Sequence, residues 1–332
     1  MEYMELTEKS LGGTVLDRNE CLSVLRCPDE RLLELLQAAF SVRYKYFGKK
    51  VVLHMLLNAK SGMCSEDCSY CSQSAASNAP IEKYPLLEEE RIVKGAGEAS
   101  AAKAKRFCIV TSGAAPSGPE LDRLCRAISR IKSEVGIEIC ASLGFLTAEA
   151  AEKLRQAGAD RYNHNINTSE KYYSRICSTH GYGDRLEALK NARKAGLDLC
   201  CGVLFGMGES EDDIIDATLA LREVKPDSIP VNFLHPIPGT ALEKQDVLSP
   251  VKCLAMLCLV RFLNPSTEIR AAGGREYRLR SLQPLALYPA NSIFVSGYLT
   301  TSGQSAEDAW RMIEDMGFVV EREAVEEVGA SL

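Results

Sequence analysis

Residues 106–136 read RFCIVTSGAAPSGPELDRLCRAISRIKSEVG and contain the pattern that decides the fold. The segment opens with a short apolar run, RFCIVTS (106–112), of the length of a buried strand. An amphipathic stretch follows at 118–136, in which apolar residues recur near the 3.6-residue period of a helix. This order predicts a strand that turns directly into a helix, the repeating unit of folds built on a parallel sheet.

The same unit recurs along the chain. The apolar runs are VVLHMLL (51–57), RFCIVTS (106–112), GIEICASL (136–143), DRYNHNI (160–166), LDLCCGVLF (197–205), DSIPVNFL (227–234), TEIRAAG (267–273) and NSIFVSG (291–297). Helical patterns lie between them at 87–105, 118–136, 147–158, 183–196, 210–224 and 249–264. About eight units predict a closed (β/α)8 TIM-type barrel, with an open doubly wound sheet as the alternative.

The two ends of the chain lie outside this repeat. Residues 1–48 are mostly helical in pattern and precede the first strand run, so we expect an N-terminal helical extension that caps the barrel. We expect the barrel over 49–300. A C-terminal helix and tail are predicted over 301–332, with the helix within SGQSAEDAWRMIEDMGFVVE (302–321).

Composition excludes several classes of protein. The 332 residues carry 39 Lys and Arg against 45 Asp and Glu, a formal net charge of −6. A mildly acidic chain lacks the basic face that nucleic-acid binding needs. The sequence contains no apolar run of about 18 residues, so we expect no membrane span. The first residues lack the pattern of a signal peptide, and we expect a cytoplasmic protein.

The 13 cysteines are the unusual feature of the composition. In a reducing compartment, clustered cysteines indicate metal binding or catalysis more often than disulfides. Cys64, Cys68 and Cys71 are spaced C-x3-C-x2-C in KSGMCSEDCSYCSQS (60–74), directly after the first strand run. Three thiolates on one short loop can hold a [4Fe–4S] cluster and leave one iron open, because such a cluster takes four ligands. A zinc knuckle and three unrelated structural thiols are the alternatives.

This motif, with Tyr70 before its last cysteine, resembles the radical S-adenosylmethionine superfamily. Over residues 45–318 the chain is similar to the biotin synthase family in the segments NAKSGMCSEDCSYCSQS, RFCIVTSG, EICASLG, RYNHNINTS, LCCGVLFGMGES and ANSIFVSGYLTT. The resemblance implies that a catalytic cluster on Cys64, Cys68 and Cys71 binds S-adenosylmethionine through its open iron, near Tyr70. Reductive cleavage of this cofactor would yield a 5′-deoxyadenosyl radical.

A second set of cysteines lies on the strand runs. Cys108, Cys140 and Cys200 belong to the second, third and fifth runs, and inward positions of a closed barrel can meet in its interior. They predict a second metal site, with three small buried hydrophobic residues as the alternative. The resemblance implies an auxiliary cluster, usually [2Fe–2S], with Arg270 as its fourth ligand. An ion pair is the other interpretation of Arg270.

The chain departs from the family pattern at Cys201, directly after Cys200. Adjacent strand residues point to opposite faces, so both thiols reach one cluster only at a bulge or a frayed strand end, which Gly202 favours. Two hypotheses stay open: Cys201 is a fourth thiolate of a larger auxiliary cluster beside Arg270, or Arg270 is itself the ligand. The remaining cysteines are interpreted as structural: Cys21, Cys27, Cys125, Cys177, Cys253 and Cys258.

Alternating asparagines mark the fourth strand run. Asn163, Asn165 and Asn167 share one face at period 2, and a cyclic urea would satisfy buried amides there. The resemblance implies that Asn163 and Asn165 face the ureido ring and S-adenosylmethionine, that Asn232 contacts the ureido ring, and that Arg185 belongs to the cofactor site. Asn167 stands where the family commonly has an aspartate that binds the ribose; the amide keeps an acceptor but loses the charge.

The function implied by the resemblance is insertion of sulfur into dethiobiotin to form biotin, a sulfurtransferase reaction in which the auxiliary cluster supplies the sulfur. An electron donor such as flavodoxin or ferredoxin and a homodimer are implied as well. One alternative is another radical S-adenosylmethionine barrel acting on an amino-acid-derived substrate, which would not need the second cysteine set. The other is a non-catalytic iron–sulfur or zinc protein, which would not need the asparagines.

Overall fold

The computed structural model describes residues 2–246 and 248–321 and contains a closed parallel barrel. Successive strands of the ring pair in parallel, except that β5 skips β6 and pairs with β7, and β1 closes the ring by pairing with β9. This confirms the predicted (β/α)8 barrel and excludes the open sheet. The strands are β1 (Lys50–Lys60), β2 (Arg106–Thr111), β3 (Glu138–Ser142), β4 (Arg161–Asn163), β5 (Asp198–Cys200), β6 (Val203–Phe205), β7 (Ser228–Phe233), β8 (Glu268–Ala271), β9 (Ser292–Phe294) and β10 (Val319–Val320).

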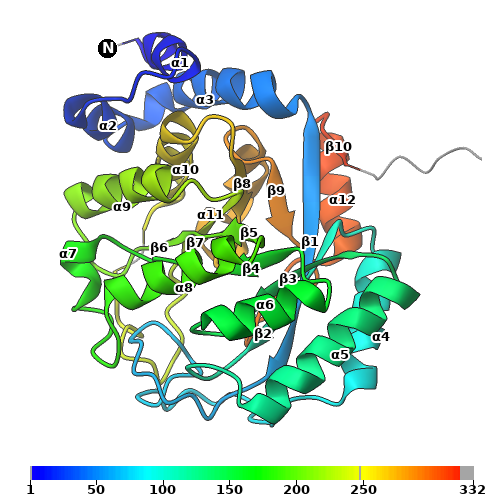
Figure 1. Ribbon diagram of the computed structural model, residues 1–332. Helices are drawn as coiled ribbons and strands as arrows, with labels where there is room; N and C mark the ends of the chain where they lie inside the picture. Colours follow the sequence, from blue (N-terminus) through cyan, green and yellow to red (C-terminus); the bar gives the residue numbers. More distant parts are fainter. Residues whose placement is uncertain (1, 247, 322–332) are drawn as a thin grey trace, which may run out of the picture.

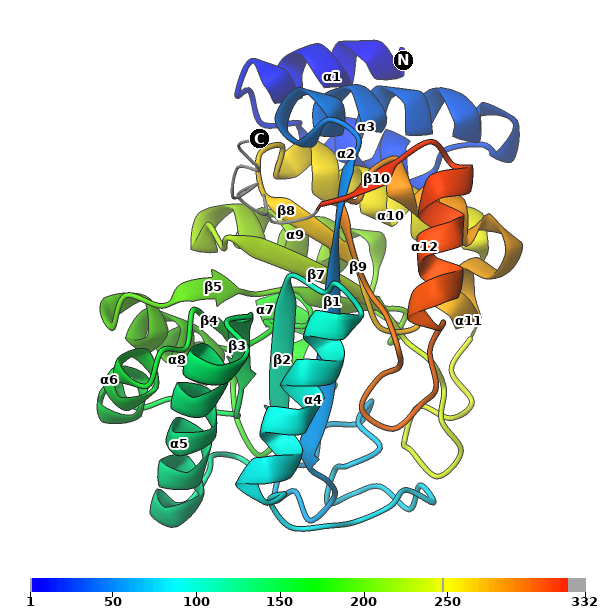
Figure 2. The same ribbon diagram turned by 90° about the vertical axis from the view of Figure 1, so that its right-hand side faces the viewer.

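Helices surround the barrel, as Figure 1 and Figure 2 show. Several begin at the side-chain caps that the sequence offers; Ser117 and Glu120 form a capping box at α5, as Ser210 and Asp213 do at α9. The helices are α1 (Tyr3–Leu11), α2 (Arg18–Leu25), α3 (Leu32–Phe47), α4 (Glu89–Ala101), α5 (Gly118–Glu134), α6 (Ala148–Gln156), α7 (Glu170–Tyr173), α8 (Tyr182–Lys194), α9 (Glu211–Val224), α10 (Pro250–Leu263), α11 (Arg275–Leu279) and α12 (Ala306–Asp315).

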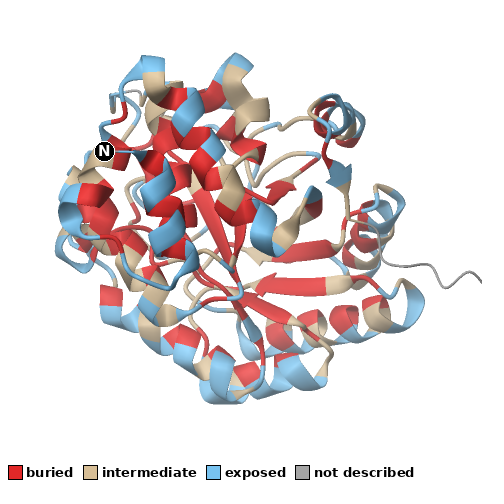
Figure 3. Ribbon diagram, turned by 90° about the horizontal axis from the view of Figure 1, so that it is seen from above, coloured by how far each residue is buried: buried red, intermediate tan, exposed pale blue. Residues whose placement is uncertain are grey.

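The N-terminal helices α1, α2 and α3 cover the end of the barrel at which β1 begins (Figure 1). They pack on α10, whose sequence PVKCLAMLCLVRFL is apolar on almost every face. A helix that is apolar all round needs cover on every side, and α10 is buried from Cys253 to Leu263. Seen from above, the buried residues gather on the strands and on the inner sides of the helices (Figure 3). The opposite end of the barrel is therefore left for the loops that follow the strands.

The C-terminal part of the chain differs in detail from the prediction. The expected helix within 302–321 is confined to α12, and residues 319–320 form β10 instead. This short strand pairs with β1 at Lys50 and Val51, outside the barrel ring. Residues 322–332 of the predicted tail lie outside the described residues.

The fifth strand run, 197–205, was predicted as one strand. The structure shows two strands there instead, β5 and β6. Both pieces pair with β7, and Gly202 lies between them. A Cβ atom on Gly202 would lie 1.9 Å from the carbonyl oxygen of Pro230, so only glycine fits this close backbone contact. The break separates two neighbouring thiols: Cys200 clusters with the cysteines of β2 and β3, and Cys201 belongs to the larger hydrophobic core.

The substitution Gly202→Ala is expected to lower the free energy of unfolding by about 2–3 kcal/mol, because β6 or Pro230 must move to admit the methyl group. Gly97→Ala is the matched control. Gly97 lies inside α4 with open space around its Cβ position, so alanine there should raise stability by about 0.5–1 kcal/mol. Urea unfolding of both variants measures the difference, and equal stabilities would contradict the close contact at Gly202.

Candidate functional site

Two adjoining cavities lie at the end of the barrel where the strands finish. One, of about 330 Å³, is in the barrel interior; the other, of about 220 Å³, lies under the loop after β1. The interior cavity contains Cys108, Cys140, Cys200, Asn232 and Arg270, and the loop cavity contains Cys64, Cys68 and Arg185. Both are bordered by Tyr70, Cys71, Gln73, Asn163, Asn165 and Asn167. The structure therefore brings the predicted site residues together, with the exception of Cys201.

Cys108, Cys140 and Cys200 form a separate buried cluster in the barrel. Cys108 and Cys140 are partners in the register of β2 and β3, so the strand pairing sets their side chains next to each other. The hydrogen bond with Cys140 lowers the pKa of Cys108, whereas the same contact raises the pKa of Cys140. A hydrogen bond with Cys140, followed by burial, raises the pKa of Cys200.

Arg270 is buried beside this cluster on β8. Its Nη1 lies 3.8 Å from Sγ of Cys200. Its Nη2 donates to Oε1 of Glu268 at 2.7 Å and to Oγ of Ser228 at 3.0 Å, and lies 3.0 Å from Nε2 of His54. Burial alone would lower the pKa of Arg270, but the Glu268 carboxylate raises it above the ordinary value. The guanidinium group thus has one edge held by protein groups and the other edge toward the sulfur atoms.

Glu268 is the buried carboxylate that pairs with Arg270 next to the interior cavity. Its Oε2 accepts from Arg106 at 2.8 Å and from Arg161 at 3.3 Å, while its Oε1 accepts from Arg270 and, at 3.1 Å, from Ser292. Burial raises the pKa of this carboxyl, but the surrounding charges hold it well below the usual range. One ionised carboxylate therefore pairs with three arginines from β2, β4 and β8.

Sequence reasoning missed this group of charges. Arg106, Arg161 and Glu268 each stand two positions before a residue that the sequence analysis did place in the site. Side chains two apart on a strand share a face. A charged residue two positions before an inward ligand was therefore the signal that could have identified them.

The loop after β1 carries the C-x3-C-x2-C motif. Cys68 is buried, and Cys64 and Cys71 are partly buried. Burial raises the pKa of Cys68 to about 12 and also raises the pKa of Cys71. Arg185 lies on the same cavity, where its Nη1 donates to the carbonyl oxygen of Asn165 at 2.9 Å. The three thiols and the buried guanidinium group of Arg185 thus border the same loop cavity.

The asparagines border the cavities, although the strand that carries them is shorter than predicted. Only Asn163 lies within β4. Its Nδ2 is 3.2 Å from Sγ of Cys200, which links the asparagines to the interior cysteines. Asn165 accepts a hydrogen bond from the backbone of Gly202 at 2.9 Å, so the break between β5 and β6 also positions this amide.

Asn167 adopts a left-handed backbone with φ of 67°, which asparagine tolerates better than most residues. Its Nδ2 donates to the hydroxyl of Tyr70 at 2.7 Å, a bond that an ionised aspartate could not donate. Asn232 donates to Val203 and accepts from the backbone of Gly273, so both ends of this amide are held by the protein.

Cys201 borders neither of the two cavities. It is fully buried, and burial raises its pKa to about 12. The thiol lies in the hydrophobic core with Leu199 and Val203, although β5 does end beside it. Of the two open hypotheses for the fourth ligand, the geometry favours Arg270.

Comparison with known sequences decides the family. The sequence profile of the radical SAM superfamily matches residues 60–221, and that of the Biotin and Thiamin Synthesis associated domain matches residues 230–319. Biotin synthase of Bacillus velezensis is 50% identical over 331 residues, covering 100% of this chain and 97% of the relative. Biotin synthase of Bacillus subtilis (strain 168) is 49% identical, covering 100% and 98%. The chain belongs to the biotin synthase family.

Solved structures share the architecture of this biotin synthase family member. Methylornithine synthase matches with a TM-score of 0.84 at 22% identity, over 96% of this chain and 97% of the other. The FeFe-hydrogenase maturase from Carboxydothermus hydrogenoformans matches with a TM-score of 0.81 at 22% identity, over 98% and 80%. At these identities the likeness supports the fold. In the described ranges, no helix has the length and apolarity that crossing a bilayer would require.

Membership of the biotin synthase family makes the chain an enzyme that works with a [4Fe–4S] cluster, S-adenosylmethionine and an auxiliary cluster. The residues in the interior cavity fit a sulfur-rich group. Nε of Arg270 is buried with no hydrogen-bond partner among the described residues, and Nη1 faces only a thiol. Buried donors need acceptors, and the sulfur atoms of a cluster would provide them.

Proposed function

We propose that the chain inserts sulfur into dethiobiotin to form biotin. The observation that carries this proposal is the pair of adjoining cavities, one with Cys108, Cys140 and Cys200 and the other with the loop cysteines. Cys71 and the three asparagines border both cavities. A single cluster site would explain only the loop cavity. Two sites that share one wall suit a substrate that must meet a radical and a sulfur source in turn.

The loop cysteines would hold the [4Fe–4S] cluster. When bound there with S-adenosylmethionine and reduced by a flavodoxin- or ferredoxin-type donor, this cluster supplies the radical that abstracts hydrogen from an unactivated carbon. Tyr70, Asn167 and Arg185 border the loop cavity and would orient the cofactor. The cation of Arg185 suits the carboxylate of S-adenosylmethionine, and the Asn167 amide suits a ribose hydroxyl.

The interior cysteines would hold the auxiliary cluster, which supplies the sulfur atom of the product. Cys108, Cys140 and Cys200 provide three thiolates and Arg270 the fourth donor, a set that suits the small [2Fe–2S] type. Leu56 and Phe294 pack against the cysteines and keep water away. A dry site protects a carbon radical from side reactions.

The amides would hold the ureido ring. Oδ1 of Asn165 accepts from the backbone of Gly202, and within the described ranges nothing accepts from its Nδ2. That donor suits the urea carbonyl oxygen, and Asn232, which borders the same interior cavity, suits a second contact with the ring. Neutral partners match a neutral substrate group, because an unpaired charge would be costly to bury beside it.

The substitution Asn167→Asp is expected to tighten the binding of S-adenosylmethionine by about 3–10-fold, because a charged acceptor makes a stronger hydrogen bond to a ribose hydroxyl than an amide does. Aspartate also tolerates the left-handed backbone at this position. Equilibrium binding to the cluster-loaded enzyme measures the effect. Weaker binding would show instead that the Asn167 amide acts through its bond to Tyr70.

An anaerobic assay tests the proposed function. Reconstituted enzyme is mixed with reductant, S-adenosylmethionine and dethiobiotin, and the products are identified by mass spectrometry. Biotin together with 5′-deoxyadenosine is the expected result. 5′-Deoxyadenosine without biotin, from enzyme whose auxiliary iron is intact, would refute dethiobiotin as the substrate.

A further inference from the structure

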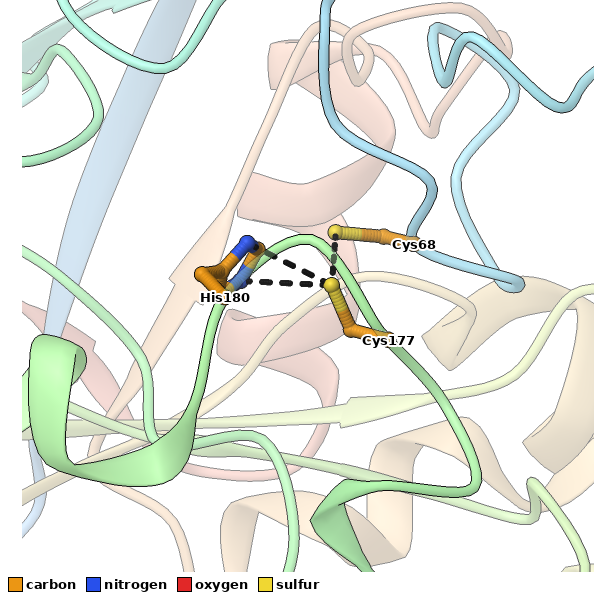
Figure 4. A group of neighbouring side chains, drawn as sticks. All are labelled: Cys68, Cys177 and His180. Atoms are coloured by element: carbon orange, nitrogen blue, oxygen red, sulfur yellow. Dashed lines mark hydrogen bonds between the residues drawn. The ribbon is translucent and has the colours of Figure 1, made fainter.

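Cys177 lies against one of the loop cysteines and has no role in the proposed reaction. It belongs to the loop between α7 and α8, and its Sγ is 3.8 Å from Sγ of Cys68 (Figure 4). Both side chains are buried, with 8% of Cys68 and 6% of Cys177 exposed. From the sequence alone Cys177 was interpreted as structural, and 109 residues separate it from Cys68 along the chain. The contact gives this thiol a partner that the sequence did not indicate.

Hydrogen bonds between the two loops hold these thiols together. The backbone N–H of Ser69 donates to the carbonyl oxygen of Ile176 at 2.9 Å. The carboxylate of Asp67 accepts from the backbone N–H groups of Ser178 at 2.9 Å and Thr179 at 3.2 Å. These bonds use only protein groups. The two sulfur atoms are therefore positioned by the fold itself.

His180 lies next to the same thiols, so the three side chains resemble a metal site (Figure 4). Both ring nitrogens are already engaged, however: Nδ1 lies 2.6 Å from the carboxylate of Glu66, and Nε2 lies 3.0 Å from Nη2 of Arg185. Sγ of Cys177 is 3.3 and 3.6 Å from the two nitrogens. The arginine would also repel a cation. The group therefore acts as a pair of thiols.

We propose that Cys68 and Cys177 form a reversible disulfide when the loop carries no cluster, with a peroxide as oxidant. Cys68 borders the loop cavity and Cys177 does not, so a small oxidant reaches Cys68 first. The O–O bond of hydrogen peroxide breaks, Cys68 becomes a sulfenic acid and one water forms. The thiol of Cys177 then displaces hydroxide, which takes up the remaining proton and leaves as a second water. Two thiols lose two electrons and two protons, and one peroxide becomes two waters.

The inference rests on the proposed function for the role of Cys68 as a cluster ligand. A sulfur in a disulfide cannot ligate iron, and a ligated sulfur cannot form the disulfide, so the two states exclude each other. The disulfide also stops oxidation of Cys68 at a stage that thiol reductants reverse, whereas a sulfinic acid is not reversed by them. Cys177 thus keeps the empty site competent for later cluster assembly.

Peptide mapping tests the disulfide directly. The full chain, freed of iron, is treated with hydrogen peroxide, alkylated, digested without reduction and analysed by mass spectrometry. We expect a Cys68–Cys177 link to be the main product at these positions, and Cys125→Ser, a change at a partly exposed thiol on α5, to leave it unaltered. A main product that links two cysteines of the 64–71 loop, or an unmodified Cys68, would overturn the proposal.

Recovery of the cluster tests the purpose of the pair. Peroxide-treated chain is reduced with dithiothreitol and reconstituted with iron and sulfide, and the loop cluster is quantified by its iron content. The wild type should recover most of the cluster, and Cys177→Ser about a tenth or less, with sulfinic acid at Cys68. Equal recovery would overturn the protective role. Neither readout needs turnover, so an enzyme that formed no biotin would refute the proposed function and leave the disulfide standing.

Discussion

Replacing Glu268 by alanine is expected to lower the free energy of unfolding by about 3–5 kcal/mol, the largest stability loss we predict for this chain. The substitution leaves three buried arginines without their common anion. Arg106 keeps Glu138 at 2.5 Å and Arg161 keeps Asp198 at 3.6 Å, but Arg270 keeps no carboxylate among the described residues. Most of the loss therefore comes from the uncompensated charge of Arg270 in the barrel interior.

Urea unfolding of the iron-free chain measures this effect. Glu138→Ala is the matched control, because it removes a carboxylate from the same group of charges at a partly exposed position, where about 1 kcal/mol or less is expected. Similar losses for the two variants would mean that Glu268 is no more than a peripheral partner. A second measurement is the iron content after reconstitution: Glu268→Ala should retain less auxiliary iron, because Arg270 then loses the carboxylate that helps to hold it beside Cys200 and, of the described residues, keeps only Ser228 and His54.

The barrel was predictable because its signals are local. Most of the strand runs end within about seven residues of a helix start, and a short apolar run there gives way to a 3.6-residue period, as between Thr111 and Gly118. The cysteine set of the loop was predictable for the same reason. Its members lie within eight residues, so spacing alone indicates that they act together.

The features that escaped prediction depend on contacts between distant segments. The break at Gly202 follows from its approach to Pro230, which no periodicity reveals. Asn165 and Asn167 were assigned to a strand because they alternate, yet the strand ends at Asn163 and the left-handed backbone of Asn167 turns the chain. Cys177 could not be paired with Cys68 without the loops in place. Tertiary packing decided each of these cases.

Cys200→Ser is expected to abolish biotin formation, by about a thousandfold or more, while formation of 5′-deoxyadenosine continues. Serine is nearly the same size, so the barrel should fold, but a hydroxyl is a poor ligand for iron compared with a thiolate. Cys200 borders only the interior cavity, Cys64 and Cys68 border only the loop cavity, and Cys71 lies on the wall that the two share. Loss of the sulfur source should therefore leave the radical-forming site intact.

The neighbouring residue offers the control, because Cys201→Ser makes the same chemical change one position along the chain. Cys201 lies in the hydrophobic core away from both cavities, so its variant should keep the wild-type iron content and form biotin. Burying a hydroxyl there costs about 1–3 kcal/mol of stability unless it finds a hydrogen-bond partner. If Cys201→Ser instead loses iron from the auxiliary cluster, four thiolates ligate that cluster, and Arg270 lies next to it without being a ligand. Iron analysis of the two variants, taken with the yield of 5′-deoxyadenosine from each, thus decides between the two ligand sets and tests whether the two cysteine sets act separately.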